Sequence, residues 1–326
     1  MAKQGQTGIV WTDETWNPVT GCTKVSQGCK HCYAERDWHR LQHLPRFAGR
    51  AFTDVVCHPE RLDQPLRWAK PRRIFVNSMS DLFHPDVPDE FIDKVFAVMS
   101  LTPRHVFQTL TKRPDRMRAY MRRIDASPLL LDIARRVISN TLGTLSVRYD
   151  FAWPLPNVWL GVSVEDQATA DQRIPLLLQT PAAVRFISAE PLFGPIRLDC
   201  LGADKPYYID ALRGEMRSTA PISLDPSPQE ELPRLDWVVV GGESGPKARP
   251  MHPDWVRILR DQCAAAVVQF MLKQWGEWAP NCLCSRPDAC KTTPRPEPGK
   301  PGCMFRCGKK AAGRLLDGVQ HDGYPA

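Results

Sequence analysis

The alternation of short apolar runs with amphipathic stretches constrains the fold of this chain more than any other sequence feature. Apolar runs that end in polar residues, as buried parallel strands do, cover residues 73–78, 105–110, 158–163, 184–190, 237–243 and 267–273. Helical stretches cover residues 89–99, 166–178 and 254–266, and the arginine-rich segment 115–148 is also largely helical in pattern. Strand, helix and strand in succession predict an α/β protein with parallel strands, arranged as a full or partial parallel (β/α) barrel.

The order of the predicted strands and helices also predicts how the 326 residues divide into domains. We assign residues 1–280 to the α/β barrel, with insertions near 115–150 and 200–236. Residues 225–233 have the composition of a loop, so we expect the second insertion to carry a short hairpin. Residues 281–326 form a cysteine-rich, basic C-terminal extension.

Composition excludes several classes of protein. Hydrophobic residues make up 43% of the chain and charged residues 24%, which is ordinary for a globular protein and argues against a disordered or fibrous one. No apolar run approaches the roughly 18 residues that span a bilayer, and the N-terminus has no apolar core of a secretory signal. We therefore expect a cytoplasmic protein with no membrane partner. The net charge of +7 permits an anionic partner such as DNA or RNA without requiring one.

Polar or charged side chains end all six predicted strands. Any one of them could be a helix cap or a strand-end hydrogen bond, but their joint placement points to an active site at the C-terminal ends of the strands. The candidate catalytic residues are Glu190, Glu243 and Lys273. The full set is Asn77, Ser78, Ser80, Asp81, Thr111, Lys112, Ser163, Glu165, Ser188, Glu190, Gly241, Gly242, Glu243 and Lys273.

Three cysteines near the N-terminus have the spacing of a metal-binding loop. Cys22, Cys29 and Cys32 follow the pattern C-x6-C-x2-C, directly before a helix that begins near Tyr33. Three thiolates can hold three corners of a [4Fe–4S] cluster and leave the fourth iron open to a small molecule. A structural zinc site and a set of redox thiols are the alternatives, although zinc usually takes four protein ligands. The isolated Cys57, Cys200 and Cys263 are expected to be small buried side chains.

A second cysteine group lies in a segment rich in proline, arginine and lysine. Such a segment cannot bury a core by itself, so bound metal is a physical reason for it to be ordered. Zinc held by four of the five thiols, an auxiliary iron–sulfur cluster and unpaired thiols are the three interpretations. The group comprises Cys282, Cys284, Cys290, Cys303 and Cys307.

Several of these segments resemble a known family. The opening 11–22 (WTDETWNPVTGC) with the three thiols, 186–192 (FISAEPL), 241–245 (GGESG), 273–278 (KQWGEW) and 308–314 (GKKAAGR) resemble the phage Gp37/Gp68-like family, also described as three-Cys-motif proteins (DUF5131). That family looks like a divergent branch of the radical S-adenosylmethionine (SAM) superfamily. The resemblance implies a [4Fe–4S] cluster on Cys22, Cys29 and Cys32 that cleaves SAM into methionine and a 5′-deoxyadenosyl radical. The first gap is three residues longer than the usual C-x3-C-x2-C spacing of that superfamily.

A weaker resemblance is to the spore photoproduct lyase branch of that superfamily. There a polar strand end followed by Asp, a Thr-Lys pair and a later Ser lie around SAM. The matching residues here are Ser78, Ser80, Asp81, Lys112 and Ser163, with Ser80, Lys112 and Ser163 implied for the methionine part of SAM. An ammonium would pair with the SAM carboxylate. The Gly241-Gly242-Glu243 sequence is similar to the glycine-rich amine-binding element, although Glu243 could equally meet the substrate.

Three functions follow from these patterns. The first is a radical SAM-type enzyme that modifies or repairs nucleic acid or a nucleotide, served by an electron donor such as flavodoxin or ferredoxin. The second is a radical SAM-type enzyme acting on a peptide or a small metabolite. The third is a non-catalytic nucleic-acid-binding protein in which both cysteine groups hold zinc.

Overall fold

The computed structural model describes residues 8–44, 47–127, 132, 136, 152–218, 230–280 and 304–325. The chain folds into two compact units. The first comprises residues 1–25, 34–162 and 180–184, and the second comprises residues 26–33, 163–179 and 185–326. The two stretches of the predicted metal loop therefore belong to different units, with Cys22 in the first and both Cys29 and Cys32 in the second.

The first unit is built on parallel strands. They are β1 (Glu14–Trp16), β4 (Arg73–Val76), β5 (Val106–Thr111) and β6 (Val158–Ser163), hydrogen-bonded in that order. Helix α3 (Asp89–Leu101) connects β4 to β5, and α4 (Pro114–Ala126) follows β5. Between β1 and β4 the chain forms β2 (Val19–Thr20), α1 (Tyr33–Leu41), β3 (Val56–Cys57), η3 (Pro59–Arg61) and α2 (Gln64–Arg67), and β2 pairs with β3 antiparallel.

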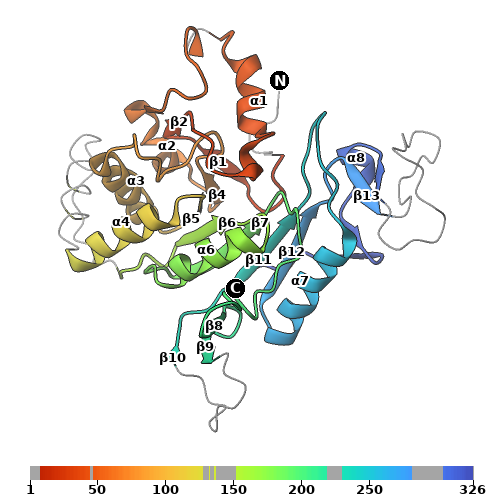
Figure 1. The fold of residues 1–326 in the computed structure, drawn as a ribbon. Helices are drawn as coiled ribbons and strands as arrows, with labels where there is room; N and C mark the ends of the chain where they lie inside the picture. The colour runs from red at the N-terminus through yellow and green to blue at the C-terminus, as the bar shows by residue number, and fades with distance from the viewer. Residues whose placement is uncertain are drawn as a thin grey trace. The chain divides into compact units, whose positions relative to one another are not determined.

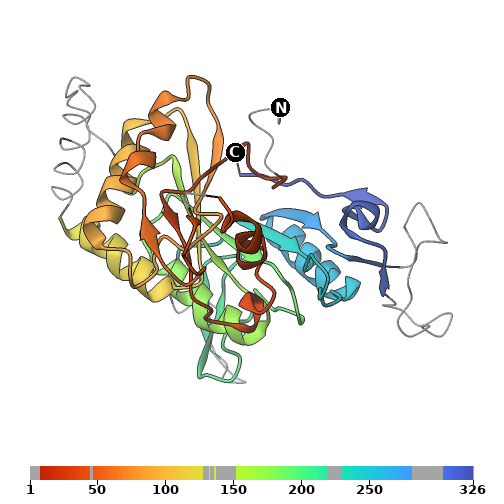
Figure 2. The same ribbon diagram turned by 90° about the horizontal axis from the view of Figure 1, so that it is seen from above.

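Helices α3 and α4 pack side by side, as both ribbon views show (Figures 1 and 2). A buried acid joins them, because the Asp93 carboxylate accepts hydrogen bonds from Tyr120 Oη at 2.9 Å and from Arg123 Nη2 at 2.5 Å. Burial raises the pKa of Asp93 above its usual value. Around this contact the core of the unit is apolar, with Phe96 and Phe107 fully buried.

The second unit repeats the same architecture on β7 (Val184–Ala189), β11 (Trp237–Gly241) and β12 (Gln269–Gln274), which are parallel neighbours. Helix α6 (Gln167–Leu178) begins with a capping box, in which Asp166 Oδ1 accepts from Thr169 N at 2.9 Å and Thr169 Oγ1 accepts from Asp166 N at 3.1 Å. Helix α7 (Pro253–Ala266) connects β11 to β12 and starts with a proline at its first position (Figure 1).

Smaller elements complete the second unit. The segment predicted to carry a hairpin does so, with β8 (Tyr207–Asp210) and β9 (Glu215–Ser218) antiparallel and β10 (Glu230–Glu231) beside β9. The other elements are η1 (Gln27–Cys29), β13 (Trp278–Pro280), β14 (Met304–Arg306), α8 (Lys309–Ala312), β15 (Leu315–Leu316) and β16 (Val319–Gln320).

The expected fold class is confirmed. Across the described residues seven parallel strands form one sheet, four strands in the first unit and three in the second, and the chain forms a partial parallel barrel. Helices lie between successive strands of this sheet except between β7 and β11, where the described chain forms the β8–β10 strands instead. The predicted helix at 254–266 and strand at 158–163 agree with α7 and β6 to within one residue. Within the described residues, no helix combines the length and the apolar character needed to cross a membrane.

The cysteine-rich extension is described only in part. Cys282, Cys284, Cys290 and Cys303 lie outside the described residues, as does most of 128–151. Cys307 is described and is half-buried, with its backbone N–H donating to Glu277 O at 3.0 Å. Of the three isolated cysteines, Cys263 is buried as expected, whereas Cys57 and Cys200 are only half-buried.

Candidate functional site

In the first unit, one buried carboxylate organises the loops at the ends of β4 and β5. Asp81 is 5% exposed and accepts hydrogen bonds from Thr111 Oγ1 at 2.7 and 2.9 Å, from Lys112 N at 3.1 Å and from Phe83 N at 3.0 Å. Arg113 Nη1 completes the set at 2.9 Å. Because its oxygens are occupied by these donors, Asp81 fixes the segment around it and has little capacity left for a ligand.

Arg113 links this carboxylate to the segment that carries Cys22. Its Nη1 lies 3.8 Å from Cys22 Sγ, and its Nη2 donates to Thr23 O at 3.1 Å and to Thr23 Oγ1 at 3.0 Å. Burial alone would lower the pKa of Arg113, but the Asp81 carboxylate and the Cys22 sulfur hold that pKa above its usual value. The guanidinium is therefore a permanent positive charge beside the first thiol of the loop.

A neutral histidine supports the same segment. Burial and the nearby charge of Arg113 lower the pKa of His84. Its Nδ1 accepts from Asp86 N at 3.2 Å, so the proton sits on Nε2, which is 2.8 Å from Thr23 Oγ1. The hydroxyl oxygen thus accepts from both His84 and Arg113, which holds the loop after Cys22 in one position.

The residues expected to contact SAM lie partly in this unit. Ser78 Oγ donates to Asn17 Oδ1 at 3.2 Å, and Ser80 Oγ donates to Val19 O at 2.8 Å. Lys112 is half-buried directly after β5. Ser163, at the end of β6, belongs to the second unit, where it is 5% exposed.

In the second unit, two predicted catalytic residues meet at the ends of β7 and β12. Lys273 Nζ lies 2.6 Å from Glu190 Oε2, and the two side chains are 14% and 18% exposed. Gln274 Nε2 donates to Glu190 Oε1 at 2.8 Å. The pair is thus a partly buried ammonium and carboxylate with an amide as its third member, which suits binding or proton transfer to a polar substrate group.

The third predicted catalytic residue, Glu243, has a different partner. Its side chain is 5% exposed and is held by Arg249, whose Nε and Nη2 donate to it at 3.0 and 2.9 Å and whose backbone N–H donates at 2.8 Å. The Arg249 guanidinium also lies 3.7 Å from the centre of the Phe193 ring. Arg249 Nη2 donates further to Gln27 O at 3.1 Å, which ties Glu243 to the segment that carries Cys29.

A buried ion pair anchors that segment from a second direction. Glu165 and Arg173 are 3.2 Å apart, and Ser26 Oγ donates to Glu165 Oε1 at 3.0 Å. Gly28 lies so close that a Cβ at this position would come within 2.5 Å of Glu165 Oε1. Cys29 follows, with its Sγ 3.9 Å from Ser26 Oγ. The stretch at Cys22 is thus held by Arg113, which follows β5, and the stretch at Cys29 by Glu165, which follows β6, and by Arg249, which pairs with Glu243 after β11.

The glycines before Glu243 have a packing explanation. A Cβ on Gly242 would come within 2.0 Å of Trp275 O, so only glycine allows this close approach between the β11 and β12 loops. This contact by itself accounts for a glycine in the sequence that is similar to an amine-binding element.

The thiols fit a thiolate-ligated metal in their chemistry. Cys22, Cys29 and Cys32 are all half-buried and form no disulfide. Among the residues that the structure describes, no three His, Cys, Asp or Glu side chains are gathered as a metal site. The ligand set thus remains a prediction from the sequence.

Two arginines of the arginine-rich segment form ion pairs within the first unit. Besides Arg113, Arg116 pairs with Asp89 at 3.1 Å and Arg123 with Asp93 at 2.5 Å. These internal ion pairs leave fewer cations for phosphate than the sequence indicates. Sequence reasoning missed Arg113, Arg173, Arg249 and Gln274, because their roles depend on tertiary contacts that no local pattern indicates.

Comparison with known proteins identifies a family and two distant structures. The family model described as "Protein of unknown function (DUF5131)" matches residues 6–325. No curated protein matches the chain. A mutant spore photoproduct lyase is similar in structure with a TM-score of 0.35 and 12% identity, over 58% of this chain and 48% of that one.

A spore photoproduct lyase complexed with dinucleoside spore photoproduct gives a TM-score of 0.35 and 11% identity, over 75% of this chain and 59% of that one. The chain thus spans less than two thirds of the length of either lyase.

Proposed function

The chain belongs to the DUF5131 family of proteins of unknown function, and from this premise we propose that it is a [4Fe–4S] radical SAM-type enzyme acting on nucleic acid or a nucleotide. The observation that carries the proposal is the anchoring of the thiol-bearing stretches. Arg113 holds the stretch at Cys22 to Asp81, and Glu165 and Arg249 hold the stretch at Cys29. An active site at the C-terminal ends of parallel strands is the usual arrangement in barrel enzymes.

Cys22, Cys29 and Cys32 would hold the cluster through three thiolates. When bound, the cluster would supply the electron that cleaves SAM into methionine and the 5′-deoxyadenosyl radical. The Arg113 guanidinium, 3.8 Å from Cys22 Sγ, would offset part of the negative charge of the thiolates.

The predicted SAM-binding and catalytic residues would have two roles. Lys112 would pair with the SAM carboxylate, and the Ser80 and Ser163 hydroxyls would bind its amino group, with Ser78 beside them. Asp81 would position Lys112 through its backbone N–H rather than contact SAM. Glu190 and Lys273, as a preformed ion pair, would orient a polar group of the substrate and hold or release a proton there.

Metal analysis tests the cluster directly. Anaerobically prepared protein should contain iron and sulfide in equal amounts and absorb broadly near about 400 nm. Cys29→Ala should lose both signals, whereas Cys200→Ala, a half-buried cysteine outside the loop, should keep them. A zinc ion with all four positions filled by protein side chains would contradict the proposal and favour the non-catalytic zinc protein.

SAM binding tests the assignment of Lys112. Lys112→Ala should retain the iron but raise the dissociation constant of SAM about 10-fold, because a charged hydrogen bond is lost. Lys70→Ala, at an exposed lysine, is the matched control.

Product analysis tests the radical chemistry. Reduction of the iron-loaded protein with SAM should yield 5′-deoxyadenosine. If the protein carries its full iron content and no 5′-deoxyadenosine forms, the radical assignment is wrong.

Salt dependence tests the class of substrate. The net charge of +7 supports a polyanion, and Arg122 on α4 is exposed. Affinity for DNA or RNA should fall as salt rises, with a slope that reports the number of phosphate contacts. Negligible affinity at low salt would reject nucleic acid and leave a peptide or a small metabolite as the substrate. An electron donor such as flavodoxin or ferredoxin would serve either reaction.

A further inference from the structure

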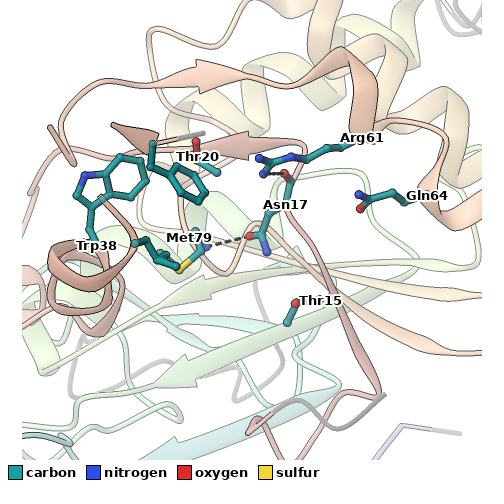
Figure 3. A pocket seen from close by; sticks show the side chains of 9 residues that line it. Thr15, Asn17, Thr20, Trp38, Arg61, Gln64 and Met79 are labelled. Carbon is teal, nitrogen blue, oxygen red and sulfur yellow. Dashed lines mark hydrogen bonds between the residues drawn. The ribbon is translucent and has the colours of Figure 1, made fainter. Parts of the chain in front are cut away.

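A pocket in the first unit lies beside the loop after β4, where Met79, between Ser78 and Ser80, lines it. It has a volume of about 270 Å³ and lies among the end of β1, helix α1 and the segment from η3 to α2 (Figure 3). Engineered cavities of about 150 Å³ take up benzene, and pockets for drug-sized ligands begin near about 300 Å³. This pocket is therefore the right size for a molecule built on one ring.

The apolar wall of the pocket is rigid. Trp38 and Phe47 form part of it, with 2% and 5% exposure and ring centres 5.1 Å apart in an edge-to-face arrangement. The Trp38 indole N–H donates to Arg50 O at 3.1 Å, so the ring presents carbon atoms to the pocket. Leu41 and Met79 add two flexible apolar side chains. A ligand would thus need an apolar body.

The opposite wall offers hydrogen-bond donors in fixed positions. Asn17 lines the pocket, and its Oδ1 accepts from Met79 N at 3.0 Å and from Ser78 Oγ at 3.2 Å, which fixes the position of its amide group (Figure 3). Thr15 and Gln64 line the same side. Arg61 Nη1 donates to Asn17 O at 3.1 Å, which holds the guanidinium at the rim.

The charge carried by the side chains that line the pocket is positive. Among the described residues that line the pocket, Arg61 is the sole charged side chain, and none carries a carboxylate. Glu60 lies 3.6 Å from Arg61 Nε but is 66% exposed and does not line the pocket, so water screens its charge. An ammonium would find no counter-ion in this pocket, whereas a carboxylate would find a guanidinium and amide donors.

We propose that this pocket is a binding site for a small organic carboxylate with a single-ring or branched apolar body. The carboxylate lies against Arg61 and the Asn17 amide, and the apolar body contacts Trp38, Phe47 and Leu41. None of the residues that line the pocket is a predicted metal ligand, so the proposal can be tested in the metal-free chain. A nucleotide is too large for it.

The test uses three probes of equal size and different charge. Benzoate, benzamide and benzylamine are titrated into the purified full-length, metal-free chain by calorimetry and ligand-observed NMR. Benzoate should bind, benzamide should bind about 10-fold more weakly because the charged hydrogen bond is lost, and benzylamine should not bind. Equal binding of the three probes, or no binding of benzoate, would overturn the proposal.

Variants locate the binding. Arg61→Gln should weaken benzoate about 10-fold, while Arg61→Lys retains most of the affinity and Arg67→Gln, at an exposed arginine of α2, changes nothing. Leu41→Trp fills the pocket and should abolish binding of benzoate and benzamide alike. Should Arg61→Gln unfold, which a thermal melt would show, Leu41→Trp still decides: unaltered benzoate binding in that variant contradicts the proposal.

Discussion

The Arg173 guanidinium donates from Nη1 to both carboxylate oxygens of Glu165 at 3.2 Å, and the two side chains are 5% and 1% exposed. The same nitrogen donates to Ser163 O at 2.7 Å. Ser26 reaches this pair from the segment that carries Cys29. A fully buried ion pair of this kind is costly to form but far more costly to break on one side, because a single charge then remains without a partner.

Removal of one member of this pair should therefore destabilise the second unit strongly. We expect Arg173→Met to lower the free energy of unfolding by about 3 kcal/mol, because it removes the guanidinium that pairs with the buried Glu165 carboxylate. The double variant Glu165→Leu, Arg173→Met should be less destabilised than the single one. Urea denaturation measures both values.

The exposed pair of Arg197 and Asp199, at 2.8 Å, is the matched control. Asp199→Asn should change the stability by no more than about 0.5 kcal/mol, since exposed ion pairs contribute little. A double variant as unstable as Arg173→Met alone would show that packing, and not charge, determines the effect.

Gly28 should tolerate no side chain. A Cβ there would lie 2.5 Å from Glu165 Oε1 and 2.7 Å from Glu165 Cγ, and Glu165 cannot move aside because Arg173 and Ser26 hold it. Gly28→Ala should displace the segment with Cys29, lowering both the thermal midpoint and the iron bound per chain. Gly194→Ala, whose Cβ would have only an ordinary 3.8 Å contact, should do neither. Full iron binding in Gly28→Ala would disprove the link.

Thiol alkylation should separate the cysteines by burial. Cys263 is fully buried, and burial raises its pKa to about 12. Its thiolate is then rare at pH 8, about one molecule in 10,000, so iodoacetamide should leave Cys263 unmodified until the chain unfolds. The half-buried Cys22 and Cys29 should react in the metal-free protein. Peptide mass spectrometry reports each site, and early labelling of Cys263 would contradict its buried position.

Acid should weaken the contact between α7 and the chain near Asp317. Hydrogen bonds from Arg257 and Arg260 lower the pKa of Asp317 from 3.8 to about 2. The pKa of Asp317 is lower in the folded chain than in the unfolded chain. The contact therefore stabilises the fold fully above about pH 4, and this stabilisation disappears as the pH falls toward 2. Asp317→Asn should therefore reduce stability at pH 7 and flatten the loss of stability between pH 4 and 2.

The effect should be modest, since the Asp317 side chain is 39% exposed and water screens the interaction. Asp125→Asn, at an exposed position of α4, should leave the acid profile unchanged. Identical pH profiles for the wild type and Asp317→Asn would show that the contact does not contribute to folding.

The parallel architecture was predictable because its signals are local. Runs such as 158–163 are apolar along their whole length, and the polar residues after them follow directly in the sequence. Glu190 and Lys273 were predicted at strand ends and meet at 2.6 Å. Strand β1 was not predicted, because its three residues, Glu14–Trp16, are too few to form a pattern.

The partners of the site residues were not predictable in the same way. Asp81 and Arg113 are 32 positions apart, and nothing in the pattern of either segment indicates that one carboxylate holds both loops. In the arginine-rich segment, Arg116 and Arg123 pair with Asp89 and Asp93 on α3, contacts that the sequence pattern does not indicate. Composition counts charges, but only the tertiary structure shows which of them are already neutralised.

The sharing of Asp81 between two loops has a consequence for protein engineering. Cys22 depends on Arg113, and Arg113 depends on Asp81, so the first thiol is supported by side chains from two distant stretches of chain. A peptide copied from residues 11–32 and grafted onto a foreign scaffold would lack that support. A transplant intended to keep the geometry at Cys22 would have to import residues 81 and 111–113 together with it.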